Sequence, residues 1–419
     1  MSRSNAVRAE RDDSDGRLAA AVASFQRTAG GAPQARLDRV LDAVRVHLGM
    51  EVAFVSEFTG GQRVFRHVAS GPWQSPVTAG AGHPLEATYC QRVVDGRLPE
   101  VIPDTRLVPE AMTMPVTTAL PIGSHISVPI YLRNGAVFGT FCCFSRLPDP
   151  TLRLRDATFM KLLASLMADS LEQERDEQRA RLDAETRIAG ALQHGIRVVF
   201  QPIVELASRR TLGFEALARF PAEPPRTPDR WFAEASLVNR GVELELAAIR
   251  AAVASFEGLP PPAFLSLNAS PDALSADGLS AALAGVPPGR IVLELTEHAI
   301  IEDYHVVQSS ITRLRSQGFR LAVDDAGAGY ASLRHILKIR PEFVKLDISI
   351  TRGVSDDPVH QAITDALNRF CVDVGAVLIA EGIETEQEVE ALRRYGVTAG
   401  QGYYLARPAP LRKFLSALR

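Results

Sequence analysis

The stretch LAVDDAGAGY, residues 321–330, ends an apolar run with two adjacent aspartates and continues with small residues. Side chains on a regular strand alternate between its two faces, so Asp324 and Asp325 can serve one site only where the strand ends and the backbone turns. Gly327 and Gly329 permit such a turn because glycine has no Cβ. The stretch therefore predicts a buried strand that ends in paired carboxylates.

The pattern of a short β-rich run followed by an amphipathic run recurs through the second half of the chain. Eight strand candidates occur within about 220 residues, which is near the size of a (β/α)₈ barrel. In chain order they are VVFQPIVEL, GFEALARF, FLSLNAS, IVLELTE, RLAVDDAG, FVKLDISI, VLIAEGIE and GVTAGQGYY. Helical runs such as PVHQAITDALNRFCVDVGA separate most of them. We therefore expect an α/β barrel.

Polar side chains stand at or near the ends of these strands. They are Glu215, Asn268, Glu294, Glu297, Asp324, Asp325, Lys345, Asp347, Glu381, Glu384 and Gln401. In a barrel these positions meet at one mouth, where barrel enzymes place their active sites. Carboxylate and amide oxygens suit Mg²⁺ or Mn²⁺, and two metals that share a carboxylate support phosphodiester hydrolysis. Lys345 is suited to orient water or to stabilise developing charge.

Each of these residues also has a structural explanation when it is taken alone. A single glutamate at a strand end is usually a loop residue or an ion-pair partner. Asn268 is suited to cap a helix, and Lys345 to pair with one acid. The recurrence of acids at the ends of separate strands favours a shared site. The histidines lack such a setting and are interpreted as surface or packing residues: His298, His305, His335 and His360.

The first half of the chain has an α+β pattern. QARLDRVLDAVRVHLG has helical apolar spacing, and HISVPIYL alternates as a strand that the turn RNG joins to AVFGTFCCFS. A second helix is expected from about Arg155, so an antiparallel sheet with flanking helices is predicted over residues 30–172. Cys90 is interpreted as a packed thiol, with a chromophore or redox site as the less favoured alternative. Cys142 and Cys143 should point to opposite faces of a strand, which disfavours a disulfide between them.

Composition places further bounds on the protein. The 419 residues contain 46 Lys and Arg against 49 Asp and Glu, a net charge of −3, so no strong field favours nucleic acid or an anionic membrane. No apolar run is long enough to cross a bilayer, and the first residues lack the core of a signal peptide.

We expect a disordered tail over residues 1–29, a charged helical linker over residues 173–192 and a cytoplasmic protein. A coiled coil in the linker is disfavoured by its poor apolar heptad.

The second half resembles the EAL family, whose members hydrolyse cyclic di-GMP. The resemblance covers residues 193–419 and rests on FQPIV, FEALAR, LNAS, ELTE, DDAGAGYASL, FVKLD, AEGIET and GQGYYLARP, in the family's order. It implies a TIM-like barrel that hydrolyses cyclic di-GMP to linear pGpG with two Mg²⁺ or Mn²⁺ ions. The alternatives are a receptor that binds cyclic di-GMP without cutting it, and a scaffold. Receptors of the family typically lose metal ligands or the lysine, and this chain keeps them.

The resemblance also implies roles for individual residues. The first metal would be held by Glu215, Asn268, Glu294 and Asp324. The second would be held by Asp324, Asp325 and Glu381, with Asp324 bridging. Glu215, Lys345 and Glu381 would take part in catalysis, with Lys345 near the attacking water. The dinucleotide would be contacted by Gln201, Leu217, Arg219, Asp347 and Gln401, and the loops would be supported by Glu297 and Glu384.

One position departs from the EAL pattern. Family members commonly have Phe after the paired aspartates, in a loop thought to couple the dimer interface to the metals, whereas this chain has Ala326. The change removes no ligand, so an active enzyme is still expected.

Residues 30–172 resemble a GAF domain through TYCQRVVDGRLPEVIPDT and IGSHISVPIYLRNGAVFGTFCCFS. GAF domains often bind small molecules or dimerise, and they regulate attached domains. The resemblance therefore implies a homodimer in which the GAF domain regulates the enzyme. The sequence does not identify the GAF ligand, and a GAF domain without a ligand is the alternative.

Overall fold

The structure is a computed structural model that describes residues 33–73, 75–221, 225–295, 304–327 and 330–415. The expected tail over residues 1–29, and Glu297, His298 and Gly329, lie outside the described residues. The chain forms two compact units, Met1–Arg179 and Ala180–Arg419. The division falls within the long helix α6 (Leu154–His194), which includes the residues of the expected linker. Each unit is described by itself.

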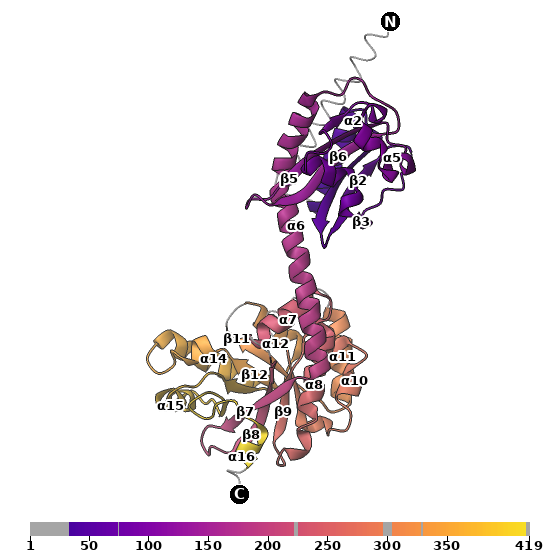
Figure 1. The fold of residues 1–419 in the computed structure, drawn as a ribbon. Helices are drawn as coiled ribbons and strands as arrows, with labels where there is room; N and C mark the ends of the chain where they lie inside the picture. The colour runs from indigo at the N-terminus through magenta and orange to yellow at the C-terminus, as the bar shows by residue number, and fades with distance from the viewer. Residues whose placement is uncertain (1–32, 74, 222–224, 296–303, 328–329, 416–419) are drawn as a thin grey trace. The chain divides into compact units, whose positions relative to one another are not determined.

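The N-terminal unit is built on a six-stranded antiparallel sheet, as the sequence predicts (Figure 1). The strand order is β3-β2-β1-β6-β5-β4. The bounds are β1 Val52–Thr59, β2 Gln62–Ser70, β3 Gly82–Pro84, β4 Val101–Ile102, β5 Ser124–Tyr131 and β6 Val137–Ser145. The expected hairpin is present, because β5 pairs with β6 from Ser124↔Ser145 to Tyr131↔Val137.

Two separate apolar cores cover the two faces of this sheet. On one face, helix α2 (Pro33–His47) and the first part of α6 contribute Leu37, Leu41 and Leu163 to a core that includes Cys143. The core on the other face includes Cys142. The adjacent cysteines therefore point to opposite faces, as predicted, and all four cysteines are free.

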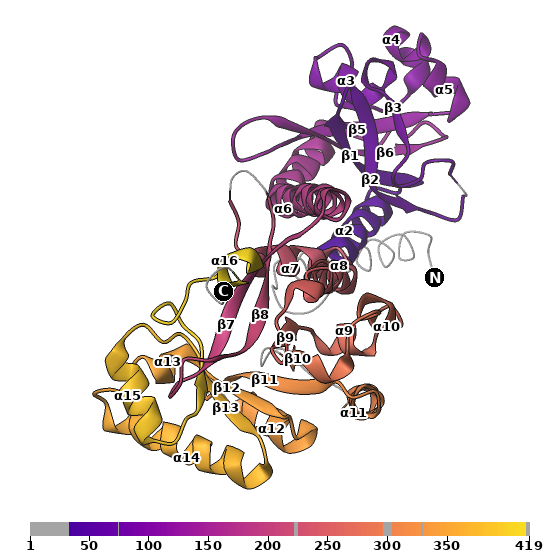
Figure 2. The ribbon, with the colours of Figure 1, turned by 90° about the horizontal axis from the view of Figure 1, so that it is seen from below.

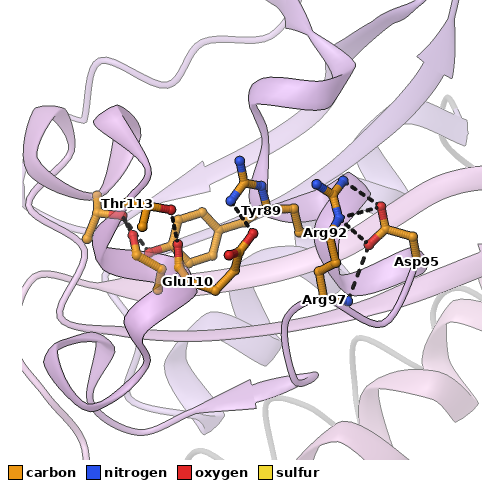
Figure 3. A network of polar contacts seen from close by, with 8 residues as sticks. Tyr89, Arg92, Asp95, Arg97, Glu110 and Thr113 are labelled. Atoms are coloured by element: carbon orange, nitrogen blue, oxygen red, sulfur yellow. Dashed lines mark hydrogen bonds and ion pairs between the residues drawn. The ribbon is translucent and has the colours of Figure 1, made fainter.

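Short helices cover the second face of the sheet and are joined by polar contacts (Figure 3). They are α3 Tyr89–Val94, α4 Pro109–Met112 and α5 Pro115–Ala119, with the 3₁₀ turns η1 Leu85–Ala87 and η2 Thr105–Leu107. Arg92 of α3 forms an ion pair with Glu110 of α4, and the Tyr89 hydroxyl lies 2.7 Å from Thr117 Oγ1 in α5. Because helices this short bury little apolar area, such contacts help to fix their positions.

The C-terminal unit is a closed eight-stranded barrel in the order β10-β11-β12-β13-β14-β7-β8-β9. The bounds are β7 Arg197–Glu205, β8 Thr211–Arg219, β9 Phe264–Asn268, β10 Ile291–Leu295, β11 Arg320–Ala326, β12 Phe343–Leu346, β13 Val377–Ala380 and β14 Ala399–Gly400. Each strand overlaps one of the eight predicted runs, although β7 begins one residue and β8 two residues before its run. The expected barrel is therefore confirmed.

The barrel differs from eight parallel strands at β7, which runs antiparallel to both of its neighbours, β8 and β14. Residues 206–210 join β7 to β8. A parallel crossover needs a dozen or more residues, so a connection this short makes an antiparallel hairpin. The remaining pairs, from β8 through β14, are parallel.

Helices surround the barrel strands in both views (Figure 1, Figure 2). They are α7 Pro228–Leu237, α8 Gly241–Val253, α9 Pro271–Ser275, α10 Leu279–Ala282, α11 Tyr304–Ser316, α12 Tyr330–Ile339, α13 Ile348–Thr351, α14 Pro358–Val374, α15 Glu386–Arg394 and α16 Leu411–Leu415, with η3 Phe256–Gly258 and η4 Pro288–Arg290. Among the helices that the structure describes, none has the length and apolar character needed to cross a membrane.

The barrel interior holds a small apolar core formed by Ile203, Phe264, Val292, Ala322, Ile379 and Ala399. Several of these residues lie two positions before a predicted site residue, as Val292 lies before Glu294. Because every second side chain of a strand points to the same face, the interior should change along the barrel from apolar to acidic.

Candidate active site

Side chains from six neighbouring strands meet at the acidic end of the barrel interior. Glu215 comes from β8, Asn268 from β9 and Glu294 from β10. Lys345 lies on β12, and Glu381 follows the last residue of β13. Together with Asp324 of β11 they lie within direct contact distances of one another, as the next paragraphs describe.

Lys345 lies at the centre of the cluster, with only 1% of its side chain exposed. Its Nζ lies near four carboxylate oxygens, at 2.6 Å from Glu381 Oε1, 3.0 Å from Glu294 Oε2, 3.3 Å from Asp324 Oδ1 and 3.5 Å from Glu215 Oε1. Burial alone would lower the pKa of Lys345, but these four acids raise it well above its ordinary value. Lys345 is therefore a fully charged cation that holds the acids together.

One lysine does not neutralise the acids around it. Burial, and the nearby charges of Glu215 and Asp324, raise the pKa of Glu294 to about 7 although Lys345 acts to lower it. Burial also raises the pKa of Glu381 well above its usual range. Carboxylates crowded in this way are stabilised in their charged form by a bound cation. The cluster has the electrostatic character of a cation site.

A β-bulge brings the paired aspartates to the same site. The pairing of β11 with β12 shifts register between Val323 and Ala326, and Asp325 has a φ of 53°. The sequence predicts that the strand ends at the aspartates, whereas the bulge lies within β11, which continues to Ala326. Gly327 then has a φ of +101°, and a Cβ there would lie 2.1 Å from Ile350 Cδ1. Glycine is therefore required at this position, as predicted.

The bulge places oxygens of Asp324, Asp325 and Glu381 within 4.8 Å of one another. Three carboxylates at this separation can share a divalent cation, because hard ions such as Mg²⁺ and Mn²⁺ bind carboxylate oxygens. The structure thus brings together all three residues that the sequence predicts for the second metal, Asp324, Asp325 and Glu381.

Two amide side chains orient the acids. Gln401 Nε2 donates hydrogen bonds to Glu215 Oε2 at 2.7 Å and to Glu381 Oε1 at 2.8 Å. Asn268 Nδ2 donates to Glu215 Oε1 at 3.2 Å. Gln401 Oε1 is buried and has no hydrogen-bond partner within the described part of the chain. The amides thus use their donors on carboxylates, which leaves oxygen atoms for a metal or a substrate.

Ser266 is a member of the site that sequence reasoning missed. Its hydroxyl donates a hydrogen bond to Glu294 Oε1, and the residue is buried. Ser266 lies two positions before Asn268 on β9, so both side chains point into the barrel. A polar residue at this spacing in the apolar run FLSLN is the signal that identifies it.

A cavity of about 740 Å³ opens beside the acids. Glu215, Asn268, Asp324 and Asp325 line one side of it, and the predicted substrate contacts Leu217 and Arg219 also line it. Helix α8 supplies an apolar wall through Ala248, Ile249 and Ala252. A volume of this size accommodates a ligand of the dimensions of a dinucleotide.

Family models match both units of the chain. The EAL domain model matches residues 185–408, and the GAF domain model matches residues 32–171. The chain belongs to the EAL family. Its N-terminal unit is a GAF domain, so both resemblances found in the sequence are confirmed.

Two similar proteins have names that refer to cyclic di-GMP. The chain is 30% identical over 232 residues to the cyclic di-GMP phosphodiesterase PA2567 of Pseudomonas aeruginosa. This match covers 52% of this chain and 39% of that protein. It is 28% identical over 236 residues to the probable cyclic di-GMP phosphodiesterase PdeD of Escherichia coli. This match covers 54% of this chain and 44% of that protein. The matches thus span less than half the length of these relatives.

Solved structures support the fold. The EAL enzyme Bd1971, in a form bound to cAMP and cyclic di-GMP, aligns with a TM-score of 0.54 at 17% identity over 88% of this chain and 93% of that chain. The PaMucR phosphodiesterase in complex with cyclic di-GMP aligns with a TM-score of 0.50 at 24% identity over 55% of this chain and 99% of that chain. At these identities the likeness shows the fold alone.

Other predicted site residues of the EAL domain have different partners. Gln201 is cross-strand neighbour to Glu215, and its Nε2 donates to Ala406 O at 3.2 Å. Asp347 accepts a 2.9 Å hydrogen bond from Ser349 N and caps α13. Glu384 is exposed and lies 2.6 Å from Arg352 in an ion pair. The roles assigned to these three residues stay predictions, and Glu297 lies outside the described residues.

Ala326 is fully buried next to the paired aspartates. It is paired with Leu346 of β12, and its carbonyl accepts a hydrogen bond from Asp347 N at 3.2 Å. The side chain belongs to the apolar core between the barrel and its helices. The residue that replaces the family's common Phe is therefore part of the packing, and it is not a ligand of the site.

Proposed function

We propose that this chain hydrolyses cyclic di-GMP to linear pGpG with the help of two Mg²⁺ or Mn²⁺ ions. The observation that carries the proposal is the contact of one buried lysine, Lys345, with four carboxylates at the mouth of an EAL barrel. The proposed substrate, cyclic di-GMP, is inferred from the names of the relatives. Receptors that bind cyclic di-GMP without cutting it typically lack a metal ligand or the lysine, and this chain keeps all of them.

The donor set supports metal binding. Glu215, Asn268, Glu294 and Asp324 would hold one ion, and Asp324, Asp325 and Glu381 the other. All the donors are oxygens, and three of the carboxylates lie within 4.8 Å of one another. When bound, the two ions supply a water of lowered pKa and neutralise negative charge on the phosphodiester.

The chain's own residues position the reaction. Lys345 fixes the carboxylates through its four contacts and places a positive charge beside the reacting phosphate. Gln401 fixes the orientation of Glu215 and Glu381 through its two hydrogen bonds. Arg219 lines the cavity and suits the second phosphate because its guanidinium presents a fork of donors. Water adds to one phosphorus, the bond to the 3′ oxygen breaks, and the 3′ hydroxyl leaves with a proton.

The proposal includes a homodimer and regulation by the GAF domain. Helix α6 supports a regulatory link, because its residues belong to both units. Ala184, Ile188 and Ala191 of α6 pack in an apolar cluster of the EAL unit, so a change in this helix would reach that unit's core.

The test is incubation of the full chain with cyclic di-GMP in Mg²⁺, in Mn²⁺ and in EDTA, followed by separation of the products. We expect pGpG only with metal, and no product from Glu215→Gln. Glu243→Gln is the matched control, because Glu243 lies on α8 in an ion pair with Arg240 and does not line the cavity. Tight binding of cyclic di-GMP without product in either metal would favour the receptor.

A further inference from the structure

The GAF domain contains a cavity of about 380 Å³ on the sheet face that the short helices cover. Its walls are mostly apolar, and they include Phe54, Phe65, Val77, Leu120 and Phe144. A cavity of this size suits a small organic molecule. Its few polar side chains then decide which molecule can bind.

Arg63 of β2 is the charged residue of this cavity. It is 6% exposed, and its guanidinium carbon lies 3.7 Å from the centroid of the Phe65 ring. Its Nη2 lies 3.0 Å from His83 Nδ1, while its Nε is buried without a hydrogen-bond partner in the described chain. No carboxylate among the described residues forms an ion pair with Arg63. A cation buried in this way is unfavourable unless an anion joins it.

His125 of β5 provides a second unpartnered group. It is 2% exposed, and burial lowers its pKa to about 3, so the ring is neutral. Its Nδ1 has no hydrogen-bond partner in the part of the chain that the structure describes. Its ring packs against Tyr89 at a centroid distance of 4.8 Å. The imidazole can therefore form one hydrogen bond to a molecule in the cavity.

The other polar groups of the cavity are already engaged. The Tyr89 hydroxyl is paired with Thr117 Oγ1, and Thr88 Oγ1 donates to Leu85 O at 2.7 Å. Cys90 also lines the cavity. Its sulfur makes its contacts with Ser56 and Cys142, each at 3.8 Å.

We infer that this cavity binds a small carboxylic acid whose carboxylate pairs with Arg63 and whose flat apolar body packs among the phenylalanine rings. The guanidinium fork matches a carboxylate in two parallel hydrogen bonds. The aromatic and aliphatic walls suit a ring or a short apolar chain. His125 Nδ1 supplies one further polar contact. This assignment concerns the GAF domain and does not depend on the reaction proposed for the EAL domain.

A nucleotide is a poorer match to these walls. Its sugar hydroxyls and base nitrogens would each need a hydrogen-bond partner on burial. Arg63 Nε and His125 Nδ1 are the buried cavity atoms without one among the described residues. The ligand should therefore have one acidic group and few other polar atoms.

The test is calorimetric titration of the full chain with benzoate, phenylacetate, indole-3-acetate and 4-hydroxybenzoate. The uncharged methyl esters, cAMP and cGMP serve as comparison ligands. We expect at least one acid to bind with a Kd below about 1 mM, and its methyl ester to bind at least tenfold more weakly. Failure of all the acids at that concentration, or preferred binding of an ester or a cyclic nucleotide, would overturn the inference.

Variants locate the binding to the cavity. Arg63→Gln should weaken the acid at least tenfold, and Arg63→Lys should weaken it less because the charge remains but the fork is lost. Arg97→Gln is the matched control, since Arg97 pairs with Asp95 at 2.6 Å with 49% of its side chain exposed (Figure 3). If Arg63→Gln does not fold, Arg63→Lys and His125→Phe still test the site. Unchanged affinity in both would contradict the assignment.

Discussion

The backbone N–H of Asp325 donates a 3.0 Å hydrogen bond to Oδ1 of Asp324, while Asp325 itself has a φ of 53°. This left-handed conformation is unusual for a residue other than glycine, although Asp and Asn tolerate it best. It turns two adjacent carboxylates toward the same site, which a regular strand cannot do. A strained backbone at this point is explained by the site that it builds.

Asp325→Asn should remove the charge of Asp325 and keep the bulge, because Asn also adopts positive φ. We expect turnover of cyclic di-GMP to fall by at least about 100-fold. Mutation of residues that only hydrogen-bond to metal ligands typically lowers metal affinity or activity 10–100-fold, and Asp325 is itself a proposed ligand. Thermal unfolding in EDTA should stay close to wild type. Initial rates in Mn²⁺ measure the effect, and wild-type turnover in this variant would contradict the role of Asp325.

Lys345→Met should destabilise the metal-free protein by about 3–5 kcal/mol, because it leaves buried carboxylates without their cation. Urea unfolding at pH 8 in EDTA measures this change. Mg²⁺ should restore part of the stability of the variant, since it neutralises the same acids. Arg352→Gln, which breaks an exposed pair with Glu384, should change stability by no more than about 1 kcal/mol. Equal stability of the two variants would contradict the central position of Lys345.

His67 should make the stability of the GAF domain depend on pH. Burial disfavours its charged form, but hydrogen bonds with Glu174 at 3.2 Å and Asp38 at 3.0 Å raise its pKa above the ordinary value. The folded protein therefore holds the proton more tightly than the unfolded chain. This contribution is complete below the unfolded pKa of about 6.5 and is lost as the pH rises through the folded pKa.

Scanning calorimetry of the full chain between pH 6 and pH 9 measures this effect. The transition of the GAF domain should shift to lower temperature as the pH rises, and the shift should be smaller in His67→Gln. An identical pH dependence in the two proteins would show that His67 does not carry the effect.

Ala326→Phe, which restores the residue common in the family, should destabilise this chain by about 1–3 kcal/mol because Ala326 is fully buried in the core. Ala326→Val should have a smaller effect. Thermal unfolding in EDTA of the wild-type protein and the two variants measures the order of their stabilities. Greater stability of the Phe variant would show that the surrounding core has room for the larger ring.

The sequence predicts the architecture well because its signals are local. Eight apolar runs at regular spacing indicate the barrel, and acids at their ends indicate its mouth. The direction of β7 depends on the short connection over residues 206–210, which the regular spacing of the apolar runs does not reveal. The bulge at Asp325 depends on the register between β11 and β12, which no local pattern determines.

The GAF cavity shows the limit of sequence reasoning most clearly. Arg63 is one of several polar residues in QRVFRHVAS, and nothing local distinguishes it from Arg66. In the structure Arg66 pairs with Glu57, whereas Arg63 lines an apolar cavity. The difference arises from strands and helices that are distant in the sequence.

The most direct test of the central claim is a single-turnover reaction in ¹⁸O-labelled water, with the full chain in excess over cyclic di-GMP and with Mn²⁺ present. We expect the substrate to be converted to pGpG that carries one ¹⁸O atom in its terminal phosphate, and we expect no conversion in EDTA. Cyclic di-GMP that is bound but remains intact in Mn²⁺ would contradict the account.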